Sequence, residues 1–195
     1  MNTNELSFRE LADVLAELGI AEVSQERIEE LENVWEKCPE EVLDSLNKMA
    51  MLLTEVGHGN YDYTTWTWTP SSNKVYSFDM EAFDVSSMYE IFFRGIQTIG
   101  GEKMVFADVV QVDNEEDDGR IVTFRLNGNA YEFTARFGGD WYDMGILSYL
   151  NQILDEGGRK LYFMTDGYQE GIIFYCDAEW AAKFEEKTGC RLEAE

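Results

Sequence analysis

Apolar side chains recur at intervals of three and four positions through the first 56 residues, the spacing typical of amphipathic helices. One stripe begins at Phe8, a second at Ile28, and a third follows Pro39 and continues to Leu53. Pro39 suits the first turn of the third helix, because the N–H that proline lacks is not needed there. The pattern therefore predicts a three-helix N-terminal unit over residues 1–56.

The boundaries of the first two helices are also visible in the sequence. Ser7 and Glu10 have the spacing of a capping box, in which each side chain accepts a hydrogen bond from the backbone N–H of the other residue. Gly19 follows the first stripe as a stop, and Ser24 precedes the second as an N-cap. These signals are local and do not depend on tertiary contacts.

Beyond residue 57 the apolar residues gather in short runs separated by Gly, Asn and Asp, which indicates strands joined by turns. The strongest turn signal is Asn127-Gly128, because a two-residue type I′ turn needs positive φ at both positions. It predicts a hairpin between residues 121–126 and 130–136. Further strands are expected at residues 75–79, 104–112, 160–165 and 171–176.

Three more helices are expected among these strands, each introduced by an aspartate that can cap it. They are residues 85–99 after Asp84, residues 144–156 after Asp143, and residues 178–188 after Asp177. Strands joined by tight turns pair antiparallel, so we predict an α+β fold: a mainly antiparallel sheet with helices packed on one face, preceded by an N-terminal helical unit. Residues 57–195 would form the sheet domain and pack with residues 1–56 as one compact protein.

The charge balance narrows the classes of partner. The chain carries 39 acidic and 15 basic residues, a formal net charge of −24. Such a surface repels phosphate backbones and anionic lipid, so we expect neither nucleic acid nor a membrane as partner. A basic protein would be attracted by the same field. We therefore expect a protein partner, and favour a basic one.

The compartment and the chemistry are bounded mainly by what the sequence lacks. It has no apolar stretch of the roughly 20 residues that span a bilayer, no start typical of a secretory signal, and three widely spaced cysteines, which favours the cytoplasm. His58 is the single histidine and lies between two glycines, a poor setting for a catalytic triad. Metal-binding motifs are also missing. We therefore predict no metal, no cofactor and no enzyme activity.

Two aromatic segments remain as candidate sites. Residues 61–68 lie in a stretch without Lys or Arg, and their aromatic side chains either fill the core from an edge strand or form a protein interface. Residues 140–143 lie at a predicted strand-to-helix junction, where loops often carry function. The predicted partner-binding residues are Tyr61, Tyr63, Trp66, Trp68, Asp140, Trp141, Tyr142 and Asp143.

An alternative hypothesis uses the carboxylates of the same segments. Asp140 with Asp143, or Asp62 beside Trp66 and Trp68, could serve as a pair of acids next to an aromatic sugar platform. This alternative describes a carboxylate-dependent enzyme, or a binding protein for a sugar or small polar ligand. It predicts a concave pocket that contains two carboxyl groups.

Three phrases carry a resemblance to a group of bacterial proteins. They are the segment that begins YDYTTWTWTP, the segment FGGDWYDMGILSYLNQIL, and the ending KLYFMTDGYQEGIIFYCDAEWAAKFEEKTG. Across roughly residues 60–190 the chain resembles uncharacterised acidic proteins of gut Firmicutes, and is similar in kind to the acidic immunity proteins that accompany bacterial polymorphic toxins. The resemblance implies a tight protein inhibitor, often of a basic nuclease or other toxin, and assigns no catalytic residue. Our hypothesis is thus an acidic protein-binding module of the immunity-inhibitor type.

Overall fold

The N-terminal part of the chain is helical. The computed structural model describes residues 3–43, 45–62, 64–65, 67–114, 119–136, 139–154 and 157–194. Its first elements are the 3₁₀ turn η1 (Thr3–Glu5) and the helices α1 (Phe8–Glu17), α2 (Gln25–Lys37), α3 (Glu40–Leu43) and α4 (Lys48–Gly57). The capping box predicted for α1 is present, and the side chain of Ser24 caps α2.

The single third helix expected from Pro39 to Leu53 is wrong, because the structure divides this segment into α3 and α4. The side-chain oxygen of Asn47 accepts hydrogen bonds from the backbone N–H groups of Met49 and Ala50 at 2.9 and 3.1 Å, which starts a new helix. Asn4 stabilises the break, since its side chain donates to the carbonyl of Leu46 at 2.7 Å. A local cap and a contact between residues 42 positions apart therefore both stabilise the break.

The strands form three antiparallel sheets in the described part of the chain. The central sheet has the order β3-β8-β7, with β3 (Val75–Asp79), β8 (Glu170–Asp177) and β7 (Arg159–Thr165). The outer sheet is β4-β5-β6, with β4 (Phe106–Asp113), β5 (Arg120–Leu126) and β6 (Asn129–Ala135). A small hairpin joins β1 (Asn60–Asp62) to β2 (Thr67–Thr69). The remaining elements are α5 (Met88–Gly100), η2 (Gly101–Lys103), α6 (Gly145–Ile153) and α7 (Ala178–Thr188).

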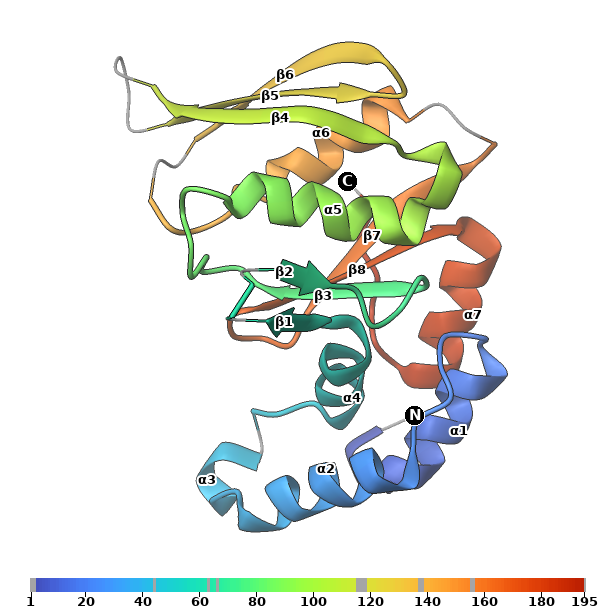
Figure 1. Cartoon of the computed structure of the whole chain (residues 1–195). Helices are drawn as coiled ribbons and strands as arrows, with labels where there is room; N and C mark the ends of the chain where they lie inside the picture. Colours follow the sequence, from blue (N-terminus) through green and yellow to red (C-terminus); the bar gives the residue numbers. More distant parts are fainter. Residues whose placement is uncertain are drawn as a thin grey trace.

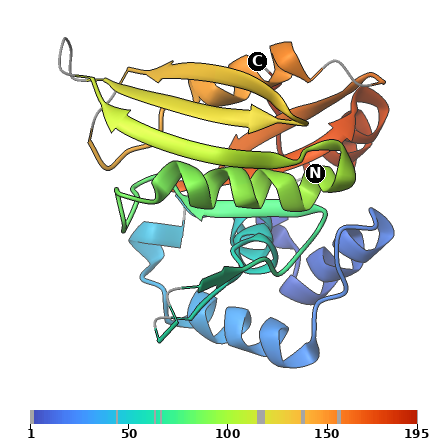
Figure 2. The same ribbon diagram turned by 45° about the horizontal axis from the view of Figure 1, so that its top comes forward.

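These elements confirm an antiparallel α+β fold with a helical N-terminal region. Asn127 and Gly128 both have positive φ, 52° and 85°, as the predicted hairpin between β5 and β6 requires. The outer sheet carries α5 and α6 on one face, whereas the central sheet is covered on both faces (Figures 1 and 2). The chain is thus layered: outer sheet, helices α5 and α6, central sheet, and then the N-terminal helices with α7.

Strand β8 separates two hydrophobic cores. Ile173 and Tyr175 pack into the core that contains α5, α6 and the outer sheet. Ile172 and Phe174 point the opposite way, into the core that contains α1, α2, α4 and α7. The alternation follows from the two-residue period of a strand, and because both faces are covered, both sets of side chains are apolar.

Two helices begin later than their aspartates predicted. Asp84 does not cap α5, since its carboxylate accepts hydrogen bonds from the hydroxyls of Ser86 and Ser87 in the turn that precedes the helix. The carboxylate of Asp143 lies two residues before α6 and accepts from the N–H of Gly145 at 2.9 Å. Short polar side chains here stabilise the preceding turn instead of the first helical N–H groups.

The ring of Tyr76 on β3 lies directly against Gly95 of α5. A Cβ atom at Gly95 would come within 2.2 Å of Tyr76 Cζ. The ring cannot readily move aside, because Tyr76 is 2% exposed and packs against Trp68, Phe78 and Phe92. The glycine therefore sets the distance between α5 and the central sheet.

We expect Gly95→Ala to lower the free energy of unfolding by about 1 to 3 kcal/mol, the usual effect of overpacking a core. Helix propensity alone would give the opposite sign, with a gain of about 1 kcal/mol. Urea unfolding monitored by circular dichroism measures the change. The control is Gly139→Ala, where the added Cβ meets nothing within 4 Å. A Gly95→Ala variant as stable as the parent chain would contradict the contact.

Candidate functional site

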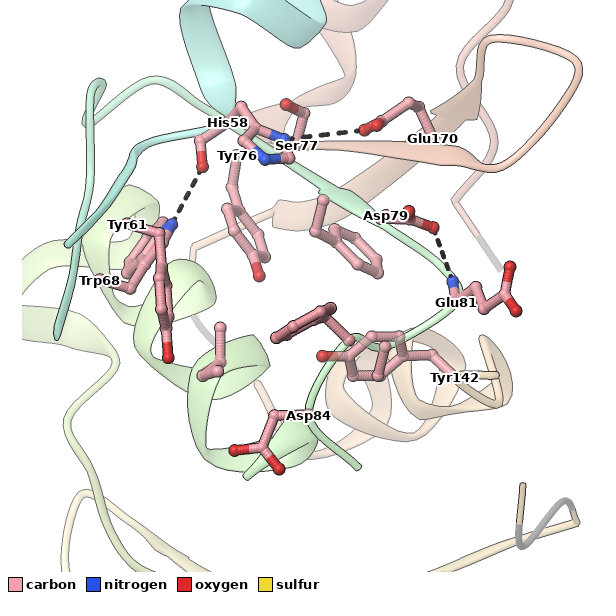
Figure 3. Close-up of a pocket in the computed structure, with 14 residues that line it drawn as sticks. His58, Tyr61, Trp68, Tyr76, Ser77, Asp79, Glu81, Asp84, Tyr142 and Glu170 are labelled. Carbon is pink, nitrogen blue, oxygen red and sulfur yellow. Dashed lines mark hydrogen bonds and ion pairs between the residues drawn. The ribbon is translucent and has the colours of Figure 1, made fainter. Parts of the chain in front are cut away.

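A cavity of about 280 Å³ opens between the β1–β2 hairpin, β3, the segment 79–84 and the first half of α5 (Figure 3). We call it the aromatic cleft. Figure 3 shows Tyr61 and Trp68 on one side and Tyr142 on the other, with Tyr76 extending from β3 toward the middle. Its lining residues are His58, Tyr61, Trp68, Tyr76, Ser77, Phe78, Asp79, Glu81, Ala82, Phe83, Asp84, Ile91, Tyr142 and Glu170.

Contacts between aromatic rings form the wall of the cleft. Trp68 meets Tyr76 edge-on at a centroid distance of 5.7 Å, and Tyr76 stacks on Phe78 at 5.1 Å. Phe78 in turn meets Tyr142 edge-on at 5.2 Å. The indole Nε1 of Trp68 donates to the carbonyl oxygen of His58 at 3.0 Å, which ties the hairpin to the end of α4. The rings are therefore held in place before any ligand arrives.

Four carboxylates lie around these rings: Asp79, Glu81, Asp84 and Glu170. Among the described residues that line the cleft, none is Lys or Arg. Asp79 and Glu170 are directly opposite each other in the β3–β8 ladder, where like charges repel. The side-chain amide of Gln169 donates to Asp79 and Glu81 at 3.1 and 2.8 Å and holds these two side chains together. The cleft is thus a region of concentrated negative charge.

Glu170 has an unusual environment among these acids. Burial raises its pKa to about 7, and the charges of Asp79 and Asp166 add to the effect. Its Oε2 atom is buried without a hydrogen-bond partner in the described part of the chain. Nδ1 of His58 lies 3.9 Å from this oxygen, which is beyond hydrogen-bond distance. Glu170 can therefore gain or lose a proton near neutral pH.

Two tyrosine hydroxyls in the cleft differ in their bonding. The hydroxyl of Tyr142 donates to the carbonyl oxygen of Met88 at 2.9 Å. The hydroxyl of Tyr76 is buried and has no hydrogen-bond partner in the described part of the chain. Burial is the main cause that raises the pKa of both phenols, so both are neutral. A buried hydroxyl without a partner is costly, and Tyr76 therefore stands out in this wall.

The structure brings together parts of both predicted segments. Tyr61, Trp68 and Tyr142 line the same cleft, although residues 61 and 142 are far apart in the sequence. Tyr63 and Trp66 lie outside the described residues. Trp68 is half-buried and packs against the core, so this part of the aromatic stretch serves the core and the cleft together.

The segment 140–143 reaches the cleft through backbone pairing. The N–H of Ala82 donates to the carbonyl of Asp140 at 2.6 Å, and the N–H of Tyr142 donates to the carbonyl of Met80 at 3.0 Å. This pairing leaves Asp140 and Trp141 exposed beside the cleft, with Trp141 43% exposed. A partner on this face would therefore meet Asp140 and Trp141 directly.

Asp143 has a different environment, because its side chain points inward and is 2% exposed. Burial alone would raise its pKa, yet hydrogen bonds from the backbone and guanidinium of Arg136 and from the N–H of Gly145 hold that pKa below its ordinary value. The carboxylate of Asp143 is thus occupied within the fold.

Sequence reasoning missed the acidic residues of the cleft and Tyr76. Asp79 is the last residue of a predicted strand and Glu170 lies just before another, and the register that places them side by side is a tertiary fact. The alternation of Tyr76 and Phe78 along β3 was a usable signal, because residues two apart share a face. His58, which the sequence places between two glycines, caps the C-terminus of α4 and lines the cleft.

No protein-family model, curated protein or solved structure matches the chain. Within the described residues, no three His, Cys, Asp or Glu side chains gather closely enough to hold a metal ion. No described helix combines the length and apolar character needed to cross a membrane. The roles of the cleft residues must therefore follow from their geometry and chemistry.

We expect Tyr76→Phe to raise the free energy of unfolding by about 1 kcal/mol, because it removes a buried hydroxyl that has no partner. The matched variant Tyr142→Phe should lower it by about 1 kcal/mol, since it deletes the hydrogen bond to Met88. Denaturant unfolding of both variants measures the two signs. Equal changes in the free energy of unfolding would contradict the difference in hydrogen bonding between the two hydroxyls.

We expect Glu170→Gln to stabilise the chain at pH 8 and not at pH 4. The pKa of Glu170 rises from 4.5 to about 7 on folding, so its favourable contribution is complete below pH 4.5 and is lost as the pH rises to about 7. Glutamine stays neutral and escapes this loss, a gain of about 2 kcal/mol at pH 8. Unfolding at both pH values tests this, with the exposed Glu132→Gln as control. An equal gain in the free energy of unfolding at both pH values would contradict the raised pKa of Glu170.

Proposed function

We propose that this chain is a binding module that captures a basic protein through the face around the aromatic cleft. The observation that carries the proposal is the composition of the cleft: aromatic rings, four carboxylates, and no Lys or Arg among its described lining residues. Aromatic side chains are enriched at interface hot spots, where they fill desolvated pockets. Carboxylates around them would select a positively charged partner.

The charge of the whole chain supports the same partner. A net charge of −24 produces a negative potential around the molecule, which raises the association rate of a basic protein. The effect is screened beyond about 8 Å at physiological salt, so the cleft itself must supply the specificity. Long-range attraction and local recognition therefore favour the same class of partner.

Exposed apolar side chains next to the cleft would serve as anchors. Phe83 lines the cleft and is 86% exposed, and Trp141 pairs through its backbone with Glu81 and is 43% exposed. Large exposed aromatic groups on a highly charged surface are a common mark of interaction sites. Our proposal includes a cytoplasmic location and, as its specific form, inhibition of a toxin or other basic protein in the manner of immunity proteins.

A second candidate function uses the paired acids of the cleft. Asp79 and Glu170 face each other across the β3–β8 ladder, and burial raises the pKa of Glu170 to about 7, as expected for a general acid. Aromatic rings beside such a pair also suit a sugar. This candidate requires that the chain turns over a carbohydrate. The turnover should be lost in Glu170→Gln and kept in Glu132→Gln.

Site-specific photo-crosslinking in the producing cells tests the leading proposal. A benzophenone amino acid at Phe83, beside the cleft, should crosslink one basic protein. The same group at Val34 on α2, which is also exposed at 57%, serves as control and should not. Replacing Glu81 and Asp84 with lysine should reduce the yield at position 83 at least tenfold. The same products from both positions, or none from Phe83, would contradict the proposal.

A further inference from the structure

We infer that the aromatic cleft is a binding site for one organic cation, a guanidinium or alkylammonium group carried on a short apolar chain. This inference deepens and rests on the proposed function, because an arginine or lysine of the partner would supply such a group. The same chemistry occurs in free amines, such as agmatine, and the test below separates the two sources.

The charge around the cleft is negative. Asp79, Glu81, Asp84 and Glu170 surround the cavity, and none of its described lining residues is Lys or Arg. Other acids of this chain have an arginine within the fold, as Asp143 has Arg136 and Asp113 has Arg120. The carboxylates of the cleft lack such a partner among its lining residues, so a bound cation would supply the balancing charge.

The volume of the cleft and the positions of its acids suit a small organic group. The cavity of about 280 Å³ lies just below the range for ligand pockets, about 300 to 1,000 Å³, and suits a group the size of one side chain. The acids come from β3, the segment 79–84 and β8, and no three of the described ligand-type residues converge as a metal site requires. The geometry favours an extended organic cation over a metal ion.

The aromatic wall of the cleft also suits a cation. A cation over the face of Trp or Tyr is attracted by the ring quadrupole, and the attraction increases where water is excluded. Tyr61 and Trp68 lie together on one side of the cleft and Tyr142 on the other (Figure 3). An apolar chain would pack against these rings while its charged end approaches the carboxylates. Both parts of the ligand thus have matching surfaces.

The hydroxyl of Tyr76 is a feature of the cleft that does not depend on the acids. Tyr76 is 2% exposed, its hydroxyl has no partner in the described part of the chain, and Figure 3 shows this hydroxyl directed into the cleft. Guanidinium and ammonium groups are pure donors, with five and three N–H bonds, and can donate to this phenol oxygen. A ligand of this kind would remove the cost of the unpaired hydroxyl.

Isothermal titration of the purified full chain tests the inference with defined probes. N-acetyl-arginine methylamide and N-acetyl-lysine methylamide mimic a partner's side chains, agmatine represents a free amine, and N-acetyl-citrulline methylamide is the neutral control. We expect at least one cation to bind at least tenfold more tightly than the citrulline probe. Tighter binding of an amide probe indicates a protein partner as the source, and tighter binding of agmatine indicates a free amine.

Two sets of variants separate a built site from diffuse attraction. Tyr76→Phe should weaken binding of the cation at least threefold without lowering the Tm, which excludes damage to the fold as the cause. The double variant Glu81→Gln with Asp84→Asn should weaken binding of the cation at least tenfold. The control, Glu26→Gln with Glu132→Gln, removes the same charge from exposed positions outside the cleft and should change the affinity for the cation less than twofold.

Three results would overturn the inference: no cationic probe binding more tightly than the citrulline probe, equal losses in the two double variants, or cellobiose binding more tightly than every cation. The outcome is separable from that of the proposed function. Crosslinking of a basic protein at Phe83 without binding of any cationic probe would leave the protein-binding function standing and remove the cation site.

Discussion

The burial of β8 between two cores is the constraint on which the rest of the structure depends. Its side chains point alternately into two cores. One core contains α5, α6 and the outer sheet, and the other contains the N-terminal helices and α7. Strand β3, paired with β8, follows the same alternation: Ser77 donates to a carbonyl of α4, whereas Tyr76 and Phe78 face α5. Because the register fixes which side chains face which core, a shift of one residue would turn both rings away from the cleft.

The cleft is a consequence of this register. Tyr76 and Phe78 supply its wall, and the end of the same ladder places Asp79 opposite Glu170. The β1–β2 hairpin and the pairing of residues 80–82 with 140–142 complete the remaining sides. The fold thus gathers acidic and aromatic side chains from five separate parts of the chain without supplying a lysine or arginine among the described lining residues. This combination is the physical basis of the proposed recognition of a cation.

Local signals predicted the elements, and tertiary contacts decided the site. Helix α7 and the Asn127-Gly128 hairpin followed from caps and turn chemistry, which act within a few residues. The break before Lys48 has a local part that the prediction missed, the cap Asn47, and a distant part, because Asn4 contributes to it from 42 positions away. Trp68 and Tyr142 were selected as aromatic residues in unusual loops, but Glu170 carried no signal, since its environment exists only once β3 and β8 pair.

The two indole N–H groups of Trp68 and Trp180 give the most direct test of a cation in the cleft. Trp68 Nε1 donates to His58 beside the cleft, whereas Trp180 Nε1 donates to Leu18 next to the other core. Titration of ¹⁵N-labelled chain with N-acetyl-arginine methylamide should shift the Trp68 indole resonance in a saturable manner and leave that of Trp180 in place. A Trp68 resonance that does not move, or equal movement of both resonances, would contradict the account.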